Sequence, residues 1–302
     1  MTLAGGGAVR HRPPGNGALR SETADAYSLL APSVLLVLLC LILPLCLMAR
    51  YSLNRYSPGD MMVAALTLEN YARFFGDSFY LGVLFRTLWL SLAATLACLV
   101  LALPAAYYLS RLKNHSAKTL LVLAIVIPLL MGNAARAAGW MVLLADKGLV
   151  NEVLIHLGIL SDPVRILYTS SAVGIGLISV LLPIMIVSLQ SVFDGVAESY
   201  EEAAMSLGAR PLRMFWHILL PMIMPGVFSG SMLCFVLAMN AYATPVLIGG
   251  PSFQMMAPKV YEQAIKVYNW PFAASMAFVL IVVTLTLTIL ASVALQRRYG
   301  KV

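Results

Sequence analysis

The stretch TLWLSLAATLACLVLALPAAYYLS, residues 87–110, contains no charged side chain. It is longer than the roughly 20 residues that an α-helix needs to cross the hydrocarbon core of a bilayer. In lipid, a helix satisfies its own backbone hydrogen bonds, so a stretch of this kind predicts a membrane-spanning helix. Several further stretches of the chain have the same character.

The composition of the whole chain agrees with this prediction. Of the 302 residues, 61% are hydrophobic and only 11% are charged, so the chain lacks the polar side chains that cover a water-soluble globule. This excludes a soluble enzyme, a nucleic-acid-binding domain and a disordered protein. The net charge of +7 comes from single basic residues between apolar runs, where we expect contact with membrane lipid and not with nucleic acid.

Six spans are the simplest division of the chain. Residues 1–27 are rich in Gly, Pro and Arg and predict a disordered N-terminal tail, followed by a six-helix transmembrane domain over residues 28–302. A cleaved signal peptide is a weaker interpretation of the first apolar run, because the tail is long and no small-x-small site follows. The expected spans are 28–49, 87–110, 119–144 and 166–193, one within the uncharged stretch 218–258 with its inner edge at Pro225-Gly226, and one within 267–296.

Lys and Arg predict the orientation. Segment 111–118 and the C-terminal tail contain basic residues and no acidic ones, which is typical of cytoplasmic segments. With both termini inside, the inner segments also hold more basic residues than the outer ones. We therefore expect an all-α polytopic membrane protein with its N- and C-termini in the cytoplasm.

The loop between the fourth and fifth spans, residues 191–221, holds four of the 13 acidic residues. Its pattern predicts two short helices. Asp194 is a candidate N-cap of the first helix, Gly208 a candidate left-handed residue at its end, and Pro211 suits the first turn of the second.

The first of these helices combines an apolar stripe with repelling charges. Glu198, Glu201 and Glu202 lie at i, i+3 and i+4, so they destabilise one another unless a cation of a partner is near. The loop is therefore either a docking surface for another protein or a solvated amphipathic segment on the membrane. The apolar stripe at helical spacing consists of Val196, Tyr200, Ala203, Ala204 and Leu207.

This loop resembles the EAA loop of permease subunits in binding-protein-dependent ATP-binding-cassette (ABC) importers. All seven fixed residues match, together with the gap between them and the position between two spans. The matching residues are Glu202, Ala203, Ala204, Gly208, Ile218, Leu220 and Pro221.

The resemblance covers nearly the whole chain beyond the tail and is to permeases of the spermidine/putrescine type. It implies a type I ABC importer permease of the bacterial inner membrane, in which the EAA loop docks in a groove on the ATPase and couples ATP-driven closure to rocking of the permeases. The implied partners are two ATPase subunits, a second permease subunit that is a paralogue of this chain, and a periplasmic substrate-binding protein. We expect that protein to dock near Arg55, Arg73 and Lys147. The further matching residues are Arg136, Trp140, Leu144, Gly148, Asn151, Pro245, Gly249-Gly250-Pro251 and Trp270-Pro271.

Motifs for catalysis are absent from the sequence. There is no G-x-x-x-x-G-K-[ST] loop, since the one Gly-Lys pair, Gly300-Lys301, is followed by Val302. ATP must then be hydrolysed by a partner subunit, and no cofactor or metal is expected in this chain. The patterns of intramembrane proteases are also missing, so we expect no enzyme.

Four polar residues within the apolar stretches are candidates for the substrate path. Arg136 lies about 26 Å along a continuous third span, near its outer end, where it either anchors the helix at the interface or faces the path. Pro128 and Gly132 favour a kink in this helix. The other three candidates, which either join helices or line the path, are Asn240, Tyr242 and Thr244.

The resemblance favours a polyamine as the solute, but the expected spans contain no carboxylate to accompany a di- or tri-cation. Either the binding protein and the second permease select the solute, or a related small molecule is carried. The alternative class is an ion-coupled secondary transporter or channel, although such carriers usually bury more ionisable groups than this sequence offers.

Overall fold

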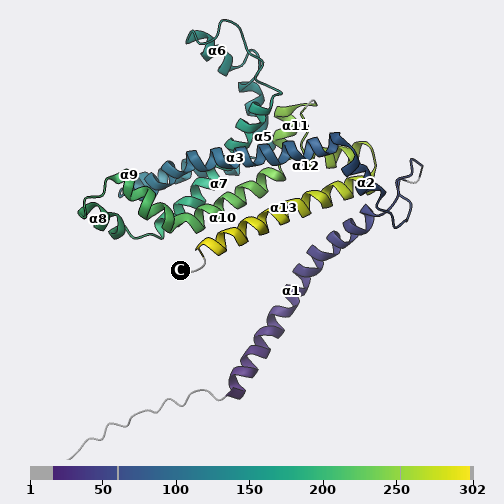
Figure 1. Ribbon diagram of the computed structural model, residues 1–302, viewed down its shortest axis with the longest axis horizontal. Helices are drawn as coiled ribbons and strands as arrows, with labels where there is room; N and C mark the ends of the chain where they lie inside the picture. The colour runs from purple at the N-terminus through teal and green to yellow at the C-terminus, as the bar shows by residue number, and fades with distance from the viewer. Residues whose placement is uncertain (1–15, 60, 252, 300–302) are drawn as a thin grey trace, which may run out of the picture. The chain divides into compact units, whose positions relative to one another are not determined.

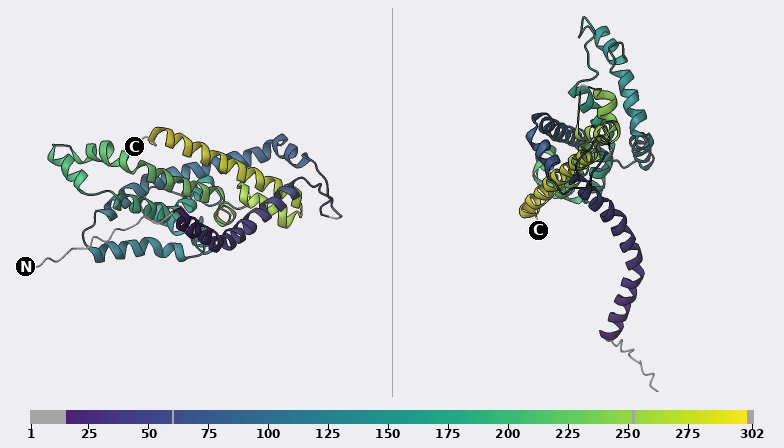
Figure 2. Two further views of the ribbon diagram at one scale, coloured as in Figure 1. Left: turned by 90° about the horizontal axis from the view of Figure 1, so that it is seen from below. Right: turned by 90° about the vertical axis from the view of Figure 1, so that its right-hand side faces the viewer.

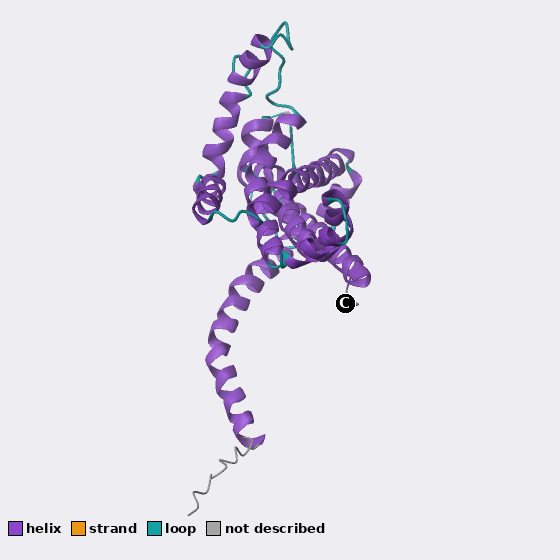
Figure 3. Cartoon of the chain, turned by 90° about the vertical axis from the view of Figure 1, so that its left-hand side faces the viewer, coloured by secondary structure: helices purple, strands orange, loops and turns teal. Residues whose placement is uncertain are grey.

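The computed structural model describes residues 16–59, 61–251 and 253–299. These residues form helices and connecting loops, and the single β-bridge among them, between Arg55 and Val63, is isolated (Figure 3). By its internal contacts the chain divides into two units, Met1–Arg50 and Tyr51–Val302. The sites described below lie in the second unit.

The first unit consists mainly of helix α1 (Asn16–Ser52). Its apolar part, Leu30–Ser52, is long enough to cross a membrane and agrees with the first expected span. The helix begins at Asn16, inside the segment predicted to be a disordered tail. The remainder of that predicted tail, residues 1–15, lies outside the described residues.

Four long helices form the framework of the second unit: α3 (Ser78–Ser110), α7 (Ser170–Asp194), α10 (Leu220–Met239) and α13 (Trp270–Tyr299). Helix α3 packs against α7 and α10, and α10 packs against α7 and α13 (Figures 1 and 2). The shorter elements are α2 (Glu69–Gly76), α4 (His115–Leu130), α5 (Asn133–Leu143), α6 (Leu149–His156), α8 (Ser199–Ser206), α9 (Pro211–Met214), η1 (Phe215–Leu219), α11 (Ala243–Gly249), α12 (Met256–Tyr261) and η2 (Glu262–Lys266).

Among the described residues, five helices are individually long and apolar enough to cross a membrane, and a sixth crossing is a bent pair of helices. Six spans are therefore confirmed if the bent pair counts as one. The five helical segments are Leu30–Ser52, Ser78–Ser110, Ser170–Asp194, Pro211–Met239 and Trp270–Leu295.

The third span is broken. Helices α4 and α5 meet at an angle of 96°, with Met131 extended and Gly132 at the N-cap of α5. Pro128 lies in the last turn of α4, so the predicted kink is confirmed and is larger than expected. The height of Arg136 estimated along one continuous helix is wrong, because this residue lies beyond the break.

The fifth span continues directly from the loop that carries the EAA residues. Helix α9, the π-helical turn η1 and α10 form one continuous segment, Pro211–Met239, so the expected inner edge at Pro225-Gly226 is wrong. Both Pro221 and Pro225 lie within the helical run. A π-helical turn is wider than an α-helical turn, and its position just before Pro221 accommodates a residue that has no backbone N–H to donate.

Small residues allow α3, α7 and α10 to approach closely. Along α3, Cys98, Ala102 and Ala106 recur every four residues and are fully buried. Gly226 of α10 lies against Val192 of α7, where a Cβ atom added to the glycine would come within 2.3 Å of the valine side chain. Close packing of this kind is the main attraction between helices in lipid, because burial of apolar surface contributes little there.

The opposite faces of these helices are apolar and exposed. Phe85, Trp89 and Val100 project from α3, and Leu285 and Leu290 project from α13. In water, such contiguous apolar surface would cause association, but on a membrane-spanning bundle it is the surface that contacts lipid.

The substitution Gly226→Ala should destabilise the bundle by about 1–3 kcal/mol, because Val192 is stiff and cannot move away from the added methyl group without shifting α7. Thermal unfolding in detergent would measure the change. Gly139→Ala in α5 is the matched control, since a Cβ atom there meets nothing within 4 Å. Equal melting temperatures for the two variants would contradict this packing account.

Candidate functional site: the EAA loop and a polar cavity

Helix α8 carries the first part of the EAA segment. Its N-cap is Glu198 and not Asp194, so the predicted capping role of Asp194 is wrong. Asp194 is the last residue of α7, and its carboxylate forms an ion pair with Lys118 Nζ at 3.0 Å. Helix α7 ends within one residue of the expected end of this span, and its last apolar residue, Phe193, is fully buried.

Gly208 ends the α8 turn with a positive φ of 83°, as predicted from the sequence. The amide of Gly208 donates to the Met205 carbonyl at 2.9 Å, and the amide of Ala209 donates to the Ala204 carbonyl at 3.1 Å. These bonds satisfy carbonyls that the helix end would otherwise leave free. Pro211 then occupies the first turn of α9, as expected.

The two faces of α8 differ in exposure. Glu202 and Ala203 are exposed, whereas Ala204 is only 5% exposed and joins the apolar core of the bundle. Tyr200 projects outward, and Leu207 is 90% exposed. The predicted apolar stripe is therefore divided: one edge holds α8 on the bundle, and the other presents apolar side chains outward.

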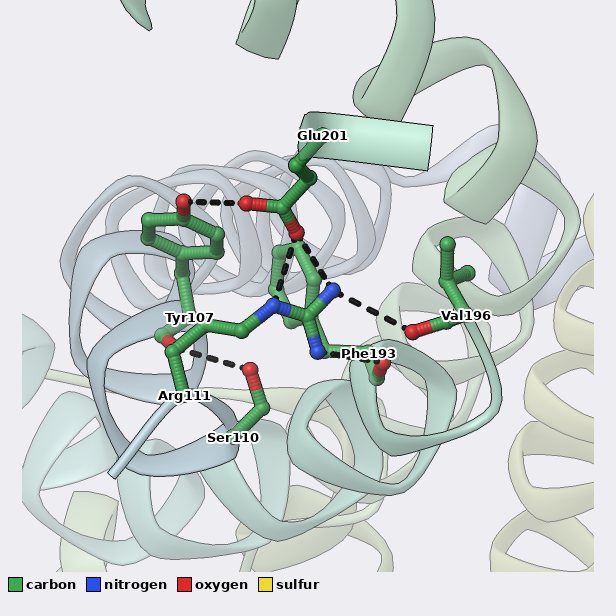
Figure 4. Close-up of polar contacts among 6 residues, drawn as sticks. All are labelled: Tyr107, Ser110, Arg111, Phe193, Val196 and Glu201. Atoms are coloured by element: carbon green, nitrogen blue, oxygen red, sulfur yellow. Dashed lines mark hydrogen bonds and ion pairs between the residues drawn. The ribbon is translucent and has the colours of Figure 1, made fainter. Parts of the chain in front are cut away.

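Glu201 turns inward, away from the other two glutamates. It is 6% exposed, and its carboxylate accepts hydrogen bonds from Tyr107 Oη and Arg111 Nε, each at 2.7 Å (Figure 4). The expectation that Glu198, Glu201 and Glu202 crowd one another and require the cation of a partner is wrong for Glu201, because Arg111 of the same chain supplies the cation.

The contacts of Tyr107 and Arg111 were not predicted. One signal for them exists in the sequence, because Glu201 and Ala204 are three residues apart and so share the face of α8 that packs inward. A carboxylate on a buried face requires a partner, and Arg111 is the first basic residue after α3.

The second part of the EAA segment lies on η1 and α10. Ile218 and Leu220 are half-buried, Pro221 is exposed, and Leu219 between them is fully buried. A groove of about 790 Å³ opens beside this segment. Basic, aromatic and aliphatic side chains line it, and the lining residues are Gly208, Arg210, Leu212, Arg213, Trp216 and His217.

A cavity of about 660 Å³ brings together all four residues predicted for the substrate path. The break in the third span positions Arg136, the loop between α10 and α11 positions Asn240 and Tyr242, and Thr244 lies in the first turn of α11. Leucine, isoleucine and valine side chains of α4, α7 and α10 supply much of the remaining wall. The polar lining residues are Arg136, Asn133, Asn240, Tyr242 and Thr244.

Arg136 is both a helix clamp and a lining residue. Its Nη2 donates to the Met131 carbonyl at the end of α4, at 3.2 Å, and its Nη1 donates to the Ser179 carbonyl of α7 at 3.4 Å. The Nε atom is buried and has no hydrogen-bond partner among the described residues. The guanidinium thus covers the Met131 carbonyl at the break and the Ser179 carbonyl of α7, which lacks a helical amide donor because residue 183 is a proline. The side chain also borders the cavity.

The other three lining residues take different positions. The Asn240 amide donates to the Val236 carbonyl at 2.9 Å, and Thr244 is buried. The ring of Tyr242 lies 4.9 Å from that of Tyr261. Desolvation, followed by the neighbouring Tyr261, raises the pKa of Tyr242.

A second pocket of about 420 Å³ also has Tyr242 in its wall. Tyr261, Gln254 and Glu262 line it as well, and the Gln254 Oε1 atom is buried without a hydrogen-bond partner in the described structure. The Glu262 carboxylate accepts from Lys259 Nζ through Oε1, at 2.9 Å. This pocket places a carboxylate and two phenol rings next to the polar cavity, although none of the expected spans contains an acidic residue.

Comparison with known proteins identifies the family. The sequence matches the binding-protein-dependent transport system inner membrane component family over residues 98–300. It is 37% identical over 217 residues to the spermidine/putrescine transport system permease protein PotB of Escherichia coli (strain K12), covering 72% of this chain and 78% of that protein. For PotB of Haemophilus influenzae the identity is 34% over 212 residues, covering 70% and 73%. For the inner membrane ABC transporter permease protein YdcU of Escherichia coli it is 32% over 230 residues, covering 72% of each.

Solved structures agree on the fold. The chain superimposes on a subunit of a bacterial alginate ABC transporter in complex with an alginate pentasaccharide-bound periplasmic protein, with a TM-score of 0.77, covering 93% of this chain and 96% of that one. A second structure of a bacterial ABC transporter for alginate import gives a TM-score of 0.72, with 93% and 98% covered. Both are 16% identical in sequence, so this likeness shows the fold alone.

These findings do not favour an ion-coupled carrier, and the family consists of transport permeases rather than enzymes. Permeases of this kind function with an ATPase and a substrate-binding protein. The chain therefore belongs to the family of binding-protein-dependent transport system inner membrane components, the permease subunits of ABC importers.

Proposed function

We propose that this chain forms half of the transmembrane path of an importer for a polyamine-like solute, and that a paralogous second permease subunit forms the other half. Two separate ATPase subunits hydrolyse the ATP, so this chain needs no cofactor of its own. A periplasmic protein delivers the solute. The observation that carries the coupling part of the proposal is the exposed face of α8, where Glu202 and Ala203 of the EAA segment project beside Leu207.

Some EAA residues are exposed for docking on the ATPase, and the others hold the loop on the bundle. Glu202, Ala203 and Gly208 are exposed and belong to the surface that enters the ATPase. Ala204 supports α8 from beneath. The remaining EAA residues, Ile218, Leu220 and Pro221, continue into the fifth span, so a displacement of the loop reaches α10 along a continuous helical segment.

The polar cavity is the proposed section of the solute path. Arg136, Asn240, Tyr242 and Thr244 line it, and they provide hydrogen bonds without an acidic residue. The names of the relatives refer to spermidine and putrescine transport. The adjoining pocket offers the rings of two tyrosines and the carboxylate of Glu262 to an alkylammonium group. Glu262 is paired with Lys259 and Lys266 also lines the pocket, so a cationic solute would have to displace the Lys259 ammonium from that carboxylate.

The outer loops are the proposed docking surface for the binding protein. Lys147 is exposed there, and Arg55 forms an exposed ion pair with Glu69 at 3.4 Å. The guanidinium of Arg73 lies over the ring of Phe272, 4.7 Å from its centroid, so this residue also stabilises the bundle. Surface pairs of this type contribute little to stability, which leaves Arg55 available to a partner.

Two neighbouring alanines separate docking from folding. Ala203→Leu should leave the melting temperature unchanged and reduce solute uptake at least tenfold, because the side chain projects from the docking face. Ala204→Leu should lower stability by about 1–3 kcal/mol through overpacking of the core. Thermal unfolding measures the stability of both variants, an uptake assay measures transport, and co-purification of the ATPase shows whether the complex still assembles. Full uptake by Ala203→Leu would refute the docking role of this face.

Substitutions at Gly208 separate backbone strain from charge. Asn and Asp both tolerate a positive φ better than other residues, and a Cβ atom at Gly208 meets nothing within 4 Å. Gly208→Asn should therefore keep part of the uptake, whereas Gly208→Asp should abolish it by placing a carboxylate beside Glu202 on the docking face. Both chains should remain in the membrane. Uptake by Gly208→Asp at the wild-type rate would contradict the prediction.

Import of radiolabelled spermidine and putrescine by the complete complex in vesicles tests the solute. Tyr242→Ala and Glu262→Gln should each raise the concentration for half-maximal import about tenfold, which corresponds to about 1.4 kcal/mol of lost binding free energy. Tyr108→Ala, at an exposed position of α3 outside the pocket, is the control. If neither polyamine is imported although the ATPase assembles, the polyamine assignment is wrong and the coupling role stands.

A further inference from the structure

Glu201, Tyr107 and Arg111 form a buried polar cluster beneath the coupling helix, which we name the α8 anchor. Both carboxylate oxygens of Glu201 are engaged: Oε2 accepts from Tyr107 and Oε1 accepts from Arg111 (Figure 4). Arg111 also forms hydrogen bonds with backbone carbonyls at and just after the end of α7. Its Nη1 donates to the Phe193 carbonyl and its Nη2 donates to the Val196 carbonyl, each at 3.3 Å. The guanidinium therefore connects three segments of the chain at one point.

These segments belong to different spans. Tyr107 and Arg111 lie at the end of α3, Phe193 lies in the last turn of α7, and Glu201 lies on α8. The ring of Tyr107 also lies against aromatic rings of two other segments. Its centroid is 5.6 Å from that of Phe193 in α7 and 5.7 Å from that of Phe215 in η1, at the start of the fifth span. The cluster thus joins the coupling helix to the ends of α3 and α7 and to the start of the fifth span.

The chemistry of the α8 anchor makes it stiffer than the other contacts of α8. Charge-assisted hydrogen bonds are shorter and stronger than neutral ones, and burial strengthens them further. The planar guanidinium fixes the directions of its donors, so the carboxylate cannot slide along it. Ala204, the neighbouring apolar contact, has only a methyl group and imposes no direction.

We propose that the α8 anchor transmits the movement of the coupling helix to α3 and α7, with Glu201 as a positioning residue. This rests on the proposed function, in which α8 docks on the ATPase. Glu202 and Ala203 contact the moving partner on the outer face of α8. On the inner face, Glu201 holds the helix to two spans, so that α8 cannot tilt without moving them. Without the anchor, ATP is hydrolysed but less of the motion reaches the cavity.

The chain supplies a matched control nearby. Lys118 and Asp194 also join the start of one helix to the end of α7, at a similar distance of 3.0 Å, but their side chains are 27% and 40% exposed. Exposed pairs are weak because water and salt screen them, so this pair holds its helices loosely. If any ion pair near the loop served equally well, Lys118→Gln would match the effect of Glu201→Gln.

The experiment uses the complete complex in vesicles with ATP, the binding protein and radiolabelled spermidine. Glu201→Gln should assemble with its partners and hydrolyse ATP, while the amount of spermidine imported per ATP falls about tenfold. Tyr107→Phe, which removes one hydroxyl and keeps the ring, should lower this ratio in the same direction by a smaller factor. Lys118→Gln should leave the ratio unchanged. An unchanged ratio in Glu201→Gln overturns the proposal.

A solute-independent measurement accompanies the uptake. Spin labels at Ser161→Cys and Ile265→Cys, two exposed positions outside the proposed docking surface and pockets, in a chain with Cys40 and Cys46 replaced by alanine, report the distance between two outer segments. Trapping with ATP and vanadate should shift this distance in the wild type and shift it less in Glu201→Gln. If Glu201→Gln does not assemble, Tyr107→Phe decides, and a normal shift together with a normal import ratio in that variant overturns the proposal.

The two proposals fail in different ways. If Ala203→Leu loses coupling while Glu201→Gln and Tyr107→Phe retain it, α8 docks as proposed and the α8 anchor does not transmit its motion. If Ala203→Leu also retains full coupling, the docking role of α8 itself is wrong, and the transmission proposal falls with it.

Discussion

Backbone hydrogen bonding is the constraint on which the rest of this structure depends. In lipid, every amide and carbonyl must find a partner within the protein, so the apolar stretches of the chain form helices. Where a helix is interrupted, a side chain has to replace the missing backbone partners. Arg136 does this twice: it donates to the carbonyl of Met131 at the break of the third span, and to the carbonyl of Ser179 in α7, whose helical donor is missing at Pro183. The polar cavity lies at this interruption, because irregular backbone and polar side chains are tolerated in a membrane where they face a cavity.

Close packing and buried charge then stabilise different parts of the molecule. The middle of the bundle is held by alanine, cysteine and glycine residues that let α3, α7 and α10 approach, as Gly226 does against Val192. Its loop end is held instead by the ion pair of Glu201 with Arg111. Packing of small side chains permits helices to slide and tilt by small amounts, whereas a directional ion pair fixes a position. This distribution suits a subunit that changes conformation in its middle and receives a displacement at one end.

Much of this arrangement was predictable from the sequence, for identifiable reasons. The spans follow from charge-free runs, the end of α8 follows from Gly208, and the cavity residues Asn240, Tyr242 and Thr244 were found as polar groups in an apolar stretch. Three features were missed or misjudged, and two of them depend on contacts between distant segments. The inner end of the fifth span was misplaced because prolines normally interrupt a helix, and here a π-helical turn accommodates Pro221. Asp194 was assigned as a cap because its pairing with Lys118, 76 residues away along the chain, is not visible in local spacing. The inward turn of Glu201 likewise depends on Arg111, at the end of another span.

The exposed apolar side chains of the coupling loop have a consequence for biogenesis. Leu207, Leu212 and Trp216 project from α8, α9 and η1 into their surroundings. Chaperones and quality-control proteases bind exposed apolar segments of this type, and surplus subunits with such surfaces aggregate. A copy of this chain synthesised without a partner to cover these side chains would therefore expose a surface that quality-control proteases recognise.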